Sequence, residues 1–349
     1  MNLQALGRGA SSVYVATHLF DHVGKLYGAR IERACHAAMV RVLERRGIAP
    51  VGPLTFLPFR DSNEAVLRGP DDSLTEAIFR IDCEKLDDAV ALVAPFQGLA
   101  QDAGIAFEMG YAAVRRVPVL SIASSFVRFS YGPERESAQV EPLLAFLSHR
   151  VVDVSALPPA AQPTREGYLT RVEDALQDVE RGVGQALEAL VEEGDMTARL
   201  HETPSPEPAR VHLEFGGGLY EYQHLLALRV AEALSRRGLT VSISERHLHG
   251  SSDAAMAADL RAVGRSQVVV TLGDGSDMDA ESAAVQGYAW ALGRRVVLYY
   301  SSRRRMCSVA GYRTQQNVMI FHSAHRIVES LEAIPRAVQQ VLSASAEAA

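Results

Sequence analysis

The sequence has few cysteines, no excess of positive charge and no long hydrophobic run. Its three cysteines are an odd number without metal-ligand spacing, which indicates reduced thiols in a cytoplasmic protein. A formal net charge of −7 argues against a nucleic-acid-binding surface, because such a surface needs clustered basic residues. No apolar run approaches the length that spans a bilayer, and the first residues show no secretion signal. We therefore expect neither nucleic acid nor membrane as a partner.

What the chain does have is enough apolar residues for a large core. Of the 349 residues, 48% are hydrophobic and 22% are charged, which is ordinary for a soluble globular protein. A chain of this length favours two domains of about 150 residues each.

The most informative stretch is residues 80–120. Residues 89–94 form a short apolar run that predicts a buried strand, residues 105–114 have helical apolar spacing, and residues 117–122 predict a second buried strand. In this βαβ unit, Asp102 and Gly104 are predicted in the loop that leaves the first strand, and Glu108 early in the helix. Open parallel sheets bind ligands at this position, and the positive end of the helix dipole would keep the carboxylate of Glu108 ionised.

The segment DAGIAFEMGYA (residues 102–112) resembles the signature of the nucleoside 2-deoxyribosyltransferase family. Asp82, twenty residues before Asp102, stands where the family has another acid of the site. Tyr14 and Phe20 match an aromatic pair after the family's first strand. The resemblance implies a flavodoxin-like, doubly wound parallel sheet, and it implies that Glu108 is the nucleophile and that Asp102 assists the departing base.

The residue types also suit this chemistry. Cleavage of an N-glycosidic bond passes through an oxocarbenium-like state, which a carboxylate stabilises and traps as an ester while a proton donor assists the leaving base. Glu108 and Asp102 are the predicted catalytic pair. Asp82 would orient the base or Asp102, and Tyr14 and Phe20 would offer apolar walls or stacking to the base. No metal or redox cofactor is needed.

The second finding is an internal repeat. Residues 259–300 align without a gap on the stretch around Glu108, with Gly287 on Gly110. Asp259 then falls on Asp82 and Asp279 on Asp102, whereas Val285 falls on Glu108. Near the start of the repeat, the alignment places Glu214 on Tyr14 and Tyr220 on Phe20. The second copy therefore lacks the nucleophile.

The segment GYRTQQNVMI (residues 311–320) resembles the family's C-terminal Asn-x-Met segment. In the family this segment reaches across a dimer interface, and its Asn contacts the sugar in the neighbouring subunit's pocket. Residues 141–150, at the corresponding place of the first copy, contain no Asn. We therefore predict a pseudo-dimer within one chain, whose working pocket combines the acids of the first copy with Asn317 and Met319 of the second. Gly104 completes the predicted substrate-binding set.

The predicted domains are a catalytic domain over residues 1–198, a linker over 199–210 and a degenerate second copy over 211–349. The catalytic domain would end in a long amphipathic helix over residues 164–194, whose apolar stripe must pack on the first copy or on the junction. Family members form dimers and trimers of dimers. The sequence leaves a monomer of two copies and a homo-oligomer, such as a trimer of tandem chains, both open.

Three functions are compatible with the sequence. The leading one is exchange of nucleobases on 2′-deoxyribose, in nucleoside salvage, with purines favoured by the Pro-Phe-x-Gly loop at residues 95–98. The second is hydrolysis of a nucleoside or its 5′-monophosphate, which arginines at 115–116 and 303–305 keep open. The third is a non-catalytic nucleotide-binding sensor. For Asp102 alone, a helix cap is the plain structural alternative.

Overall fold

The computed structural model describes most of the chain. The described residues are 11–17, 22–63, 73–96, 101–124, 140–154, 165–193, 204–215, 221–246, 252–273, 278–301, 306–307, 313–314 and 317–347.

The first half is a five-stranded parallel sheet with strand order β2-β1-β3-β4-β5. Its central strands are fully buried apolar runs, as parallel strands covered by helices on both faces require. The elements in chain order are β1 (Val13–Val15), α2 (His22–Arg45), β2 (Thr55–Phe56), η1 (Phe59–Asn63), α4 (Ser73–Asp87), β3 (Ala91–Phe96), α5 (Ala103–Arg115), β4 (Val119–Ala123), α6 (Pro142–Leu147), β5 (Arg150–Asp153) and α7 (Arg165–Glu193).

The second half contains a five-stranded parallel sheet with strand order β7-β6-β8-β9-β12. When the strands of each sheet are numbered along the chain, both sheets have the order 2-1-3-4-5. A two-stranded antiparallel ribbon accompanies it. The elements are β6 (Arg210–Glu214), α8 (Glu221–Ser235), β7 (Thr240–Ile243), α9 (Asp253–Arg265), β8 (Val268–Leu272), α10 (Ala280–Ala291), β9 (Arg295–Tyr299), β10 (Met306–Cys307), β11 (Arg313–Thr314), α11 (Val318–Ser323), β12 (Arg326–Val328), η2 (Leu331–Ala333) and α12 (Ile334–Glu347).

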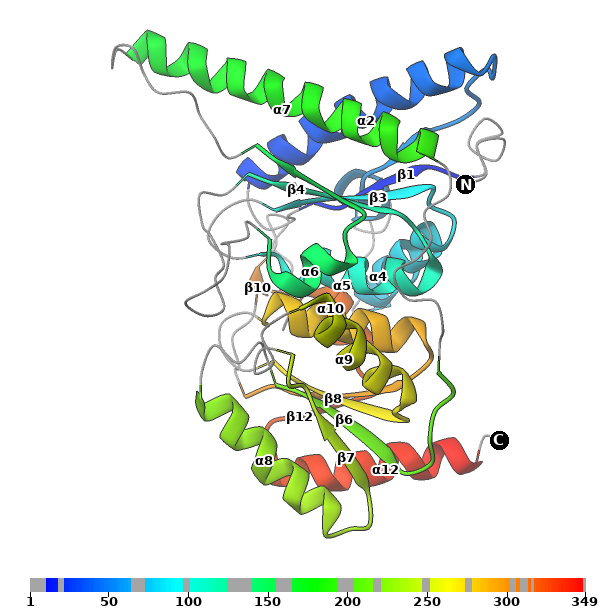
Figure 1. The fold of residues 1–349 in the computed structure, drawn as a ribbon, viewed down its shortest axis with the longest axis vertical. Coiled ribbons are helices and arrows are strands. Elements are labelled where there is room, and N and C mark those ends of the chain that lie inside the picture. Colours follow the sequence, from blue (N-terminus) through cyan, green and yellow to red (C-terminus); the bar gives the residue numbers. More distant parts are fainter. Residues whose placement is uncertain are drawn as a thin grey trace.

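The two halves are stacked, with their inner helices in contact (Figure 1). From one end of the molecule to the other, the layers are α2 with α7, the first sheet, α4 to α6, then α9 with α10, the second sheet, and finally α8 with α12. The α/β prediction with two doubly wound parallel sheets is confirmed. The predicted long helix exists as α7, and its apolar stripe packs with α2 over the first sheet.

The contact between α5 and α10 is backbone against backbone. A Cβ atom on Gly110 would lie 1.8 Å from the carbonyl oxygen of Ala284, and a Cβ on Gly287 would lie 2.0 Å from that of Phe107. Gly287 is 177 positions after Gly110, and Ala284 is 177 positions after Phe107 (287 − 110 and 284 − 107). Each helix therefore presents equivalent residues to the other, as the two sides of a two-fold symmetric interface do.

A single hydrophobic core continues across this contact. It contains Phe107 and Tyr111 of the first half together with Tyr288 and Met319 of the second. Trp290 lies on the rim of this core, and its ring is 5.5 Å from that of Phe79 across the interface. The two halves consequently share a core rather than touching at a polar surface.

The sheet pairing corrects one part of the repeat alignment. Tyr14 pairs with Leu92, and His212 pairs with Val269, which is 177 positions after Leu92. His212 is therefore the counterpart of Tyr14, and Glu214 is the counterpart of Ala16. The alignment by residue type placed this segment two positions out of register, because it matched aromatic residues and not the strand pairing.

None of the helices in the described part of the chain is long and apolar enough to cross a membrane. Cys35 and Cys83 are buried free thiols.

We predict that Gly287→Ala destabilises the protein although alanine favours helices. The added methyl group would overlap the carbonyl oxygen of Phe107, and overpacking of this kind costs about 1–3 kcal/mol. Gly182→Ala in α7 is the matched control, because its Cβ would meet nothing closer than 3.7 Å, and it should be neutral or stabilising by roughly 0.5–1 kcal/mol. Denaturant unfolding measures both. Equal stability of the two variants would contradict the close packing of α5 on α10.

Candidate functional site

Helix α5 carries the predicted catalytic acids at its N-terminal end. Asp102 is the N-cap, and its Oδ1 accepts hydrogen bonds from the backbone N–H groups of Gly104 (2.7 Å) and Ile105 (3.0 Å). Asp102 thus caps α5, which is the structural alternative considered for it. Its capping role does not exclude a second, catalytic role. Gly104 lies in the first turn of α5 rather than in the loop before it.

Glu108 is the sixth residue of α5, one turn beyond Gly104 and on the same face of the helix. Its side chain is buried, with 6% of the residue exposed. The hydroxyl of Tyr14, at the centre of the sheet, donates a hydrogen bond of 2.7 Å to Oε1 of Glu108. This hydrogen bond fixes the orientation of the Glu108 carboxyl group.

The environment of Glu108 favours its neutral form. Burial raises the pKa of Glu108 well above its ordinary value, the charge of Asp82 raises it further, and the Tyr14 hydrogen bond only partly opposes them. The prediction that the helix start keeps Glu108 ionised is therefore wrong. The carboxyl lies past the first turn, where the helix dipole has faded, and burial dominates.

Asp82 is a second buried carboxyl, on α4, with 2% of the residue exposed. Burial raises the pKa of Asp82 to about 7, against a hydrogen bond from Ser62. Its Oδ1 has no hydrogen-bond partner among the described residues. An acceptor that is buried without a partner is costly, so a ligand group that donates to it would be favoured.

Asn317 comes from the second half and lies against the start of α5. A Cβ on Gly104 would be 2.3 Å from Nδ2 of Asn317 and 3.0 Å from Oδ1 of Asp102. The missing side chain at position 104 is therefore what leaves room for both polar groups. Asp102 and Asn317, which are more than 200 positions apart, therefore meet at Gly104, one turn of α5 before Glu108.

The segment that carries Asn317 is fixed by hydrogen bonds that the sequence did not reveal. Asn317 caps α11 by accepting from the N–H of Met319 at 3.0 Å. Nε2 of Gln286, on α10, donates to the carbonyl oxygen of Ile320 and to Oγ of Ser323, both at 2.7 Å. Gln286 is fully buried. A glutamine within the apolar run of residues 283–291 was the available signal.

Helix α11 of the second half also contacts α4 of the first half. Nε2 of His322, near the end of α11, lies 2.8 Å from Oγ1 of Thr75 on α4. Met319 is buried in the shared core, with 4% of the residue exposed, and so anchors α11; its predicted contact with a ligand stays a prediction. An apolar side chain next to the interface gains more from core burial than from exposure to a ligand.

The other predicted residues have mixed outcomes. Tyr14 is fully buried, its ring packs on Phe56 at 5.3 Å between centroids, and its hydroxyl binds Glu108; its predicted contact with a base stays a prediction. Phe20 lies outside the described residues. Arg60, which follows β2, pairs with Asp61 and Glu32 at the surface.

Arg115 does not support a phosphate site. It lies at the opposite end of α5 from Asp102 and pairs with Asp87 at 2.8 Å and with the hydroxyl of Tyr111 at 3.2 Å. The other arginines in this argument, at positions 303–305, lie outside the described residues.

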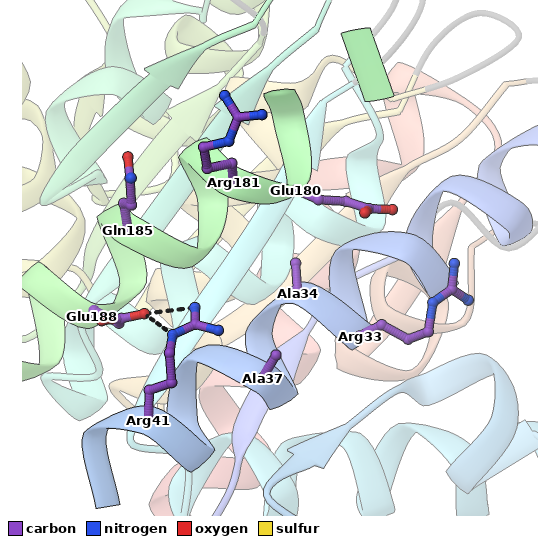
Figure 2. A pocket seen from close by; sticks show the side chains of 8 residues that line it. All are labelled: Arg33, Ala34, Ala37, Arg41, Glu180, Arg181, Gln185 and Glu188. Carbon is purple, nitrogen blue, oxygen red and sulfur yellow. Dashed lines mark hydrogen bonds and ion pairs between the residues drawn. The ribbon is translucent and has the colours of Figure 1, made fainter. Parts of the chain in front are cut away.

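A groove of about 590 Å³ lies elsewhere, between α2 and α7 on the outer face of the first sheet (Figure 2). Arginines and glutamates line it, including Arg41, which pairs with Glu188. Exposed pairs of this kind each contribute about 0–1 kcal/mol, and the sheet separates them from Glu108. The groove is therefore the seam between two surface helices.

Among the described residues, His212, Glu214 and Asp259 are the group whose side-chain atoms are close enough to hold a metal, within 4.8 Å of one another. The guanidinium of Arg246 already binds both carboxylates there, with Nη1 2.7 Å from Glu214 and 2.8 Å from Asp259. A guanidinium and a metal ion would compete for the same oxygens, so these residues do not fit a metal while Arg246 is in place.

Comparison with known proteins agrees with this geometry. None of the curated proteins matches the chain. Residues 13–158 match the family model described as nucleoside 2-deoxyribosyltransferase. The match covers β1 to β5 and so includes Tyr14, Asp82, Asp102 and Glu108. Residues 13–158 of the first half are therefore similar to the nucleoside 2-deoxyribosyltransferase family.

Proposed function

We propose that the protein transfers 2′-deoxyribose between nucleobases through an ester on Glu108. The observation that carries this proposal is the buried Glu108 carboxyl, which Tyr14 orients one turn of α5 beyond the place where Asp102 and Asn317 meet. The family match of the first half supports this type of activity.

In the first step, the bond between C1′ and the base nitrogen breaks, and its electron pair leaves with the base. A proton on the Asp102 carboxyl passes to the base, and an oxygen of ionised Glu108 forms a bond to C1′. In the second step, another base attacks C1′, its proton returns to Asp102, and Glu108 is released. The configuration at C1′ is retained overall, because each of the two substitutions inverts it.

Burial of Glu108 serves this chemistry. A carboxylate in a poorly solvated place is a better nucleophile than a hydrated one, and the developing positive charge of the sugar stabilises its ionised form. Asp82, whose Oδ1 lacks a partner among the described residues, is placed to accept a hydrogen bond from the base. Asn317 would hold the hydroxyl end of the sugar.

We propose purines as the exchanged bases and nucleoside salvage as the purpose. The Pro-Phe-x-Gly sequence at residues 95–98 supports purines by its resemblance to the purine-exchanging branch. The repeat and the matching strand orders support the second half as a degenerate copy, with residues 1–198, 199–210 and 211–349 as domain, linker and copy.

We predict that Glu108→Gln lowers exchange by at least about 10³-fold, because an amide cannot replace the carboxylate nucleophile. The assay incubates deoxyinosine with adenine and measures deoxyadenosine. In parallel, wild-type protein reacted with a 2-fluoro-deoxyribosyl nucleoside should gain the mass of the sugar on Glu108. Free sugar without exchange would instead indicate a hydrolase, and neither product would indicate a sensor.

We predict that Asn317→Ala lowers kcat/KM by roughly 10²-fold, because it removes a group that positions the sugar. The same change also removes the cap of α11, which costs about 0.5–2 kcal/mol. Asn317→Ser is the matched variant, because serine restores the cap and still lacks the amide. It should be stable and as inactive as Asn317→Ala. Full activity of the serine variant would contradict the role of the amide.

We predict that Asp82→Asn moves the acidic limb of the pH profile of kcat to lower pH, by roughly one unit. After burial, the charge of Asp82 is the main cause that raises the pKa of Glu108, and only ionised Glu108 attacks. Asp88→Asn, at an exposed position directly after α4, is the control and should leave the acidic limb of the pH profile in place. A limb that stays or moves upward in Asp82→Asn would show that the two carboxyls do not interact.

A further inference from the structure

The second half contains a counterpart of the site around Glu108, and its contents differ. By strand pairing and by the offset of 177 positions, His212 corresponds to Tyr14, Asp259 to Asp82 and Glu281 to Gly104. We call these residues, together with Glu214 and Arg246, the second pocket. Where the first site has a small residue that admits Asn317, the second pocket has a glutamate.

Arg246 is fully buried at the centre of the second pocket, with 1% of the residue exposed. Its Nη1 donates to Glu214 at 2.7 Å and to Asp259 at 2.8 Å, its Nη2 donates to Glu214 at 3.1 Å, and its Nε donates to Glu281 at 3.1 Å. Three carboxylates from three elements thus converge on one guanidinium, as they would on a bound cationic or hydrogen-bonding ligand.

The first half has an arginine at the same register, which points elsewhere. Phe56 pairs with Tyr14, and Ser242 pairs with His212; Arg60 and Arg246 each follow four positions later (60 − 56 and 246 − 242). The side chain of Arg60 is 45% exposed and pairs with Asp61 and Glu32 outside the site. The counterpart arginine therefore leaves the first site open and fills the second.

The charges around Arg246 are consistent with a permanent occupant. Burial alone would raise the pKa of Glu214, but the charge of Arg246 outweighs it and holds that pKa at about 2. Glu141, the N-cap of α6, reaches this region from the first half, and burial followed by the charge of Asp279 raises its pKa to about 9. This environment favours the neutral form of Glu141, and Arg246 binds Glu214, Asp259 and Glu281.

The second pocket is also connected to the first half. Glu281, which Arg246 binds through one oxygen, accepts a hydrogen bond from the N–H of Leu143 through the other, at 2.7 Å. Leu143 lies in the first turn of α6, and α6 packs on α5. A carboxylate at a helix N-terminus is stabilising, so this contact joins the two halves at α6, in addition to the contact that α11 makes with α4.

We propose that the guanidinium of Arg246 is a built-in occupant of the second pocket, which takes the place of a ligand and locks α6 onto the second half. The chain then has one ligand site, in the first half. The lock itself does not depend on the proposed function, whereas the identity of the ligand in the first half rests on it.

The lock is tested by chemical rescue of Arg246→Ala. Removing the guanidinium leaves buried carboxylates without their cation, so Tm should fall by about 10 °C. Millimolar guanidinium chloride should restore most of the loss with a saturable dependence, whereas urea, which has the same shape and no charge, should not. Arg60→Ala is the matched control and should keep its Tm with no response to guanidinium. An Arg246→Ala variant with wild-type Tm would overturn the lock.

If Arg246→Ala does not fold, Arg246→Lys keeps the test decisive. Lysine retains the charge but cannot bridge Glu214, Asp259 and Glu281 together, so its Tm should lie below wild type. A lysine variant with the Tm of wild type would overturn the proposal. Equal rescue by urea and guanidinium in either variant would do the same, because the pocket would then respond to volume and not to charge.

The single ligand site is tested by calorimetric titration of Glu108→Gln with deoxyinosine, in which turnover is blocked. One equivalent bound per chain supports the proposal, and two equivalents overturn it. No binding would mean that the proposed function has the wrong ligand, and the guanidinium rescue would then decide the lock by itself. The two failures are therefore distinguishable.

Discussion

The structure depends on the backbone contact between α5 and α10. Gly110 and Gly287 let the two helices approach until a Cβ atom would overlap a carbonyl oxygen of the partner helix. The contact sets the positions of Glu108 on α5 and Gln286 on α10 relative to each other. On α5 it lies beside Phe107, next to Glu108, and on α10 it lies beside Gln286, which holds α11 and so Asn317. A looser interface would separate the carboxyl of Glu108 from the amide of Asn317.

The two halves have the same strand order, but the space at their equivalent sites is open in the first half and filled by side chains in the second. The first half leaves space, with Gly104 at the helix start and Arg60 turned outward, and it keeps a buried carboxyl at Glu108. The second half fills the equivalent space with Arg246 and Glu281. Burying these charges is tolerated because each carboxylate has a guanidinium or backbone N–H partner, and removing one member would leave the others uncompensated. In our proposal, the chain resembles a dimer in which one site binds the ligand and the other is a structural support.

Much of this could be predicted from the sequence. The acids at 82, 102 and 108 and their gapless repeat predicted two parallel sheets, and GYRTQQNVMI predicted that Asn317 meets the first half. The raised pKa of Glu108 and the burial of Tyr14 and Met319 could not be predicted, because the packing of elements distant in sequence decides all three. Arg246 was missed for a related reason. It follows a short strand like Arg60, and only the fold shows that one arginine points outward and the other inward.

The central claim is that one chain builds one pocket from both of its halves. The most direct measurement is a crystal structure of the protein trapped with a fluorinated deoxyribosyl group on Glu108. The account predicts that the amide of Asn317 from the same chain lies within hydrogen-bond distance of a hydroxyl of that sugar, and that Arg246 still fills the second pocket. A sugar whose hydroxyls are held by other groups, with Asn317 turned away, would contradict it.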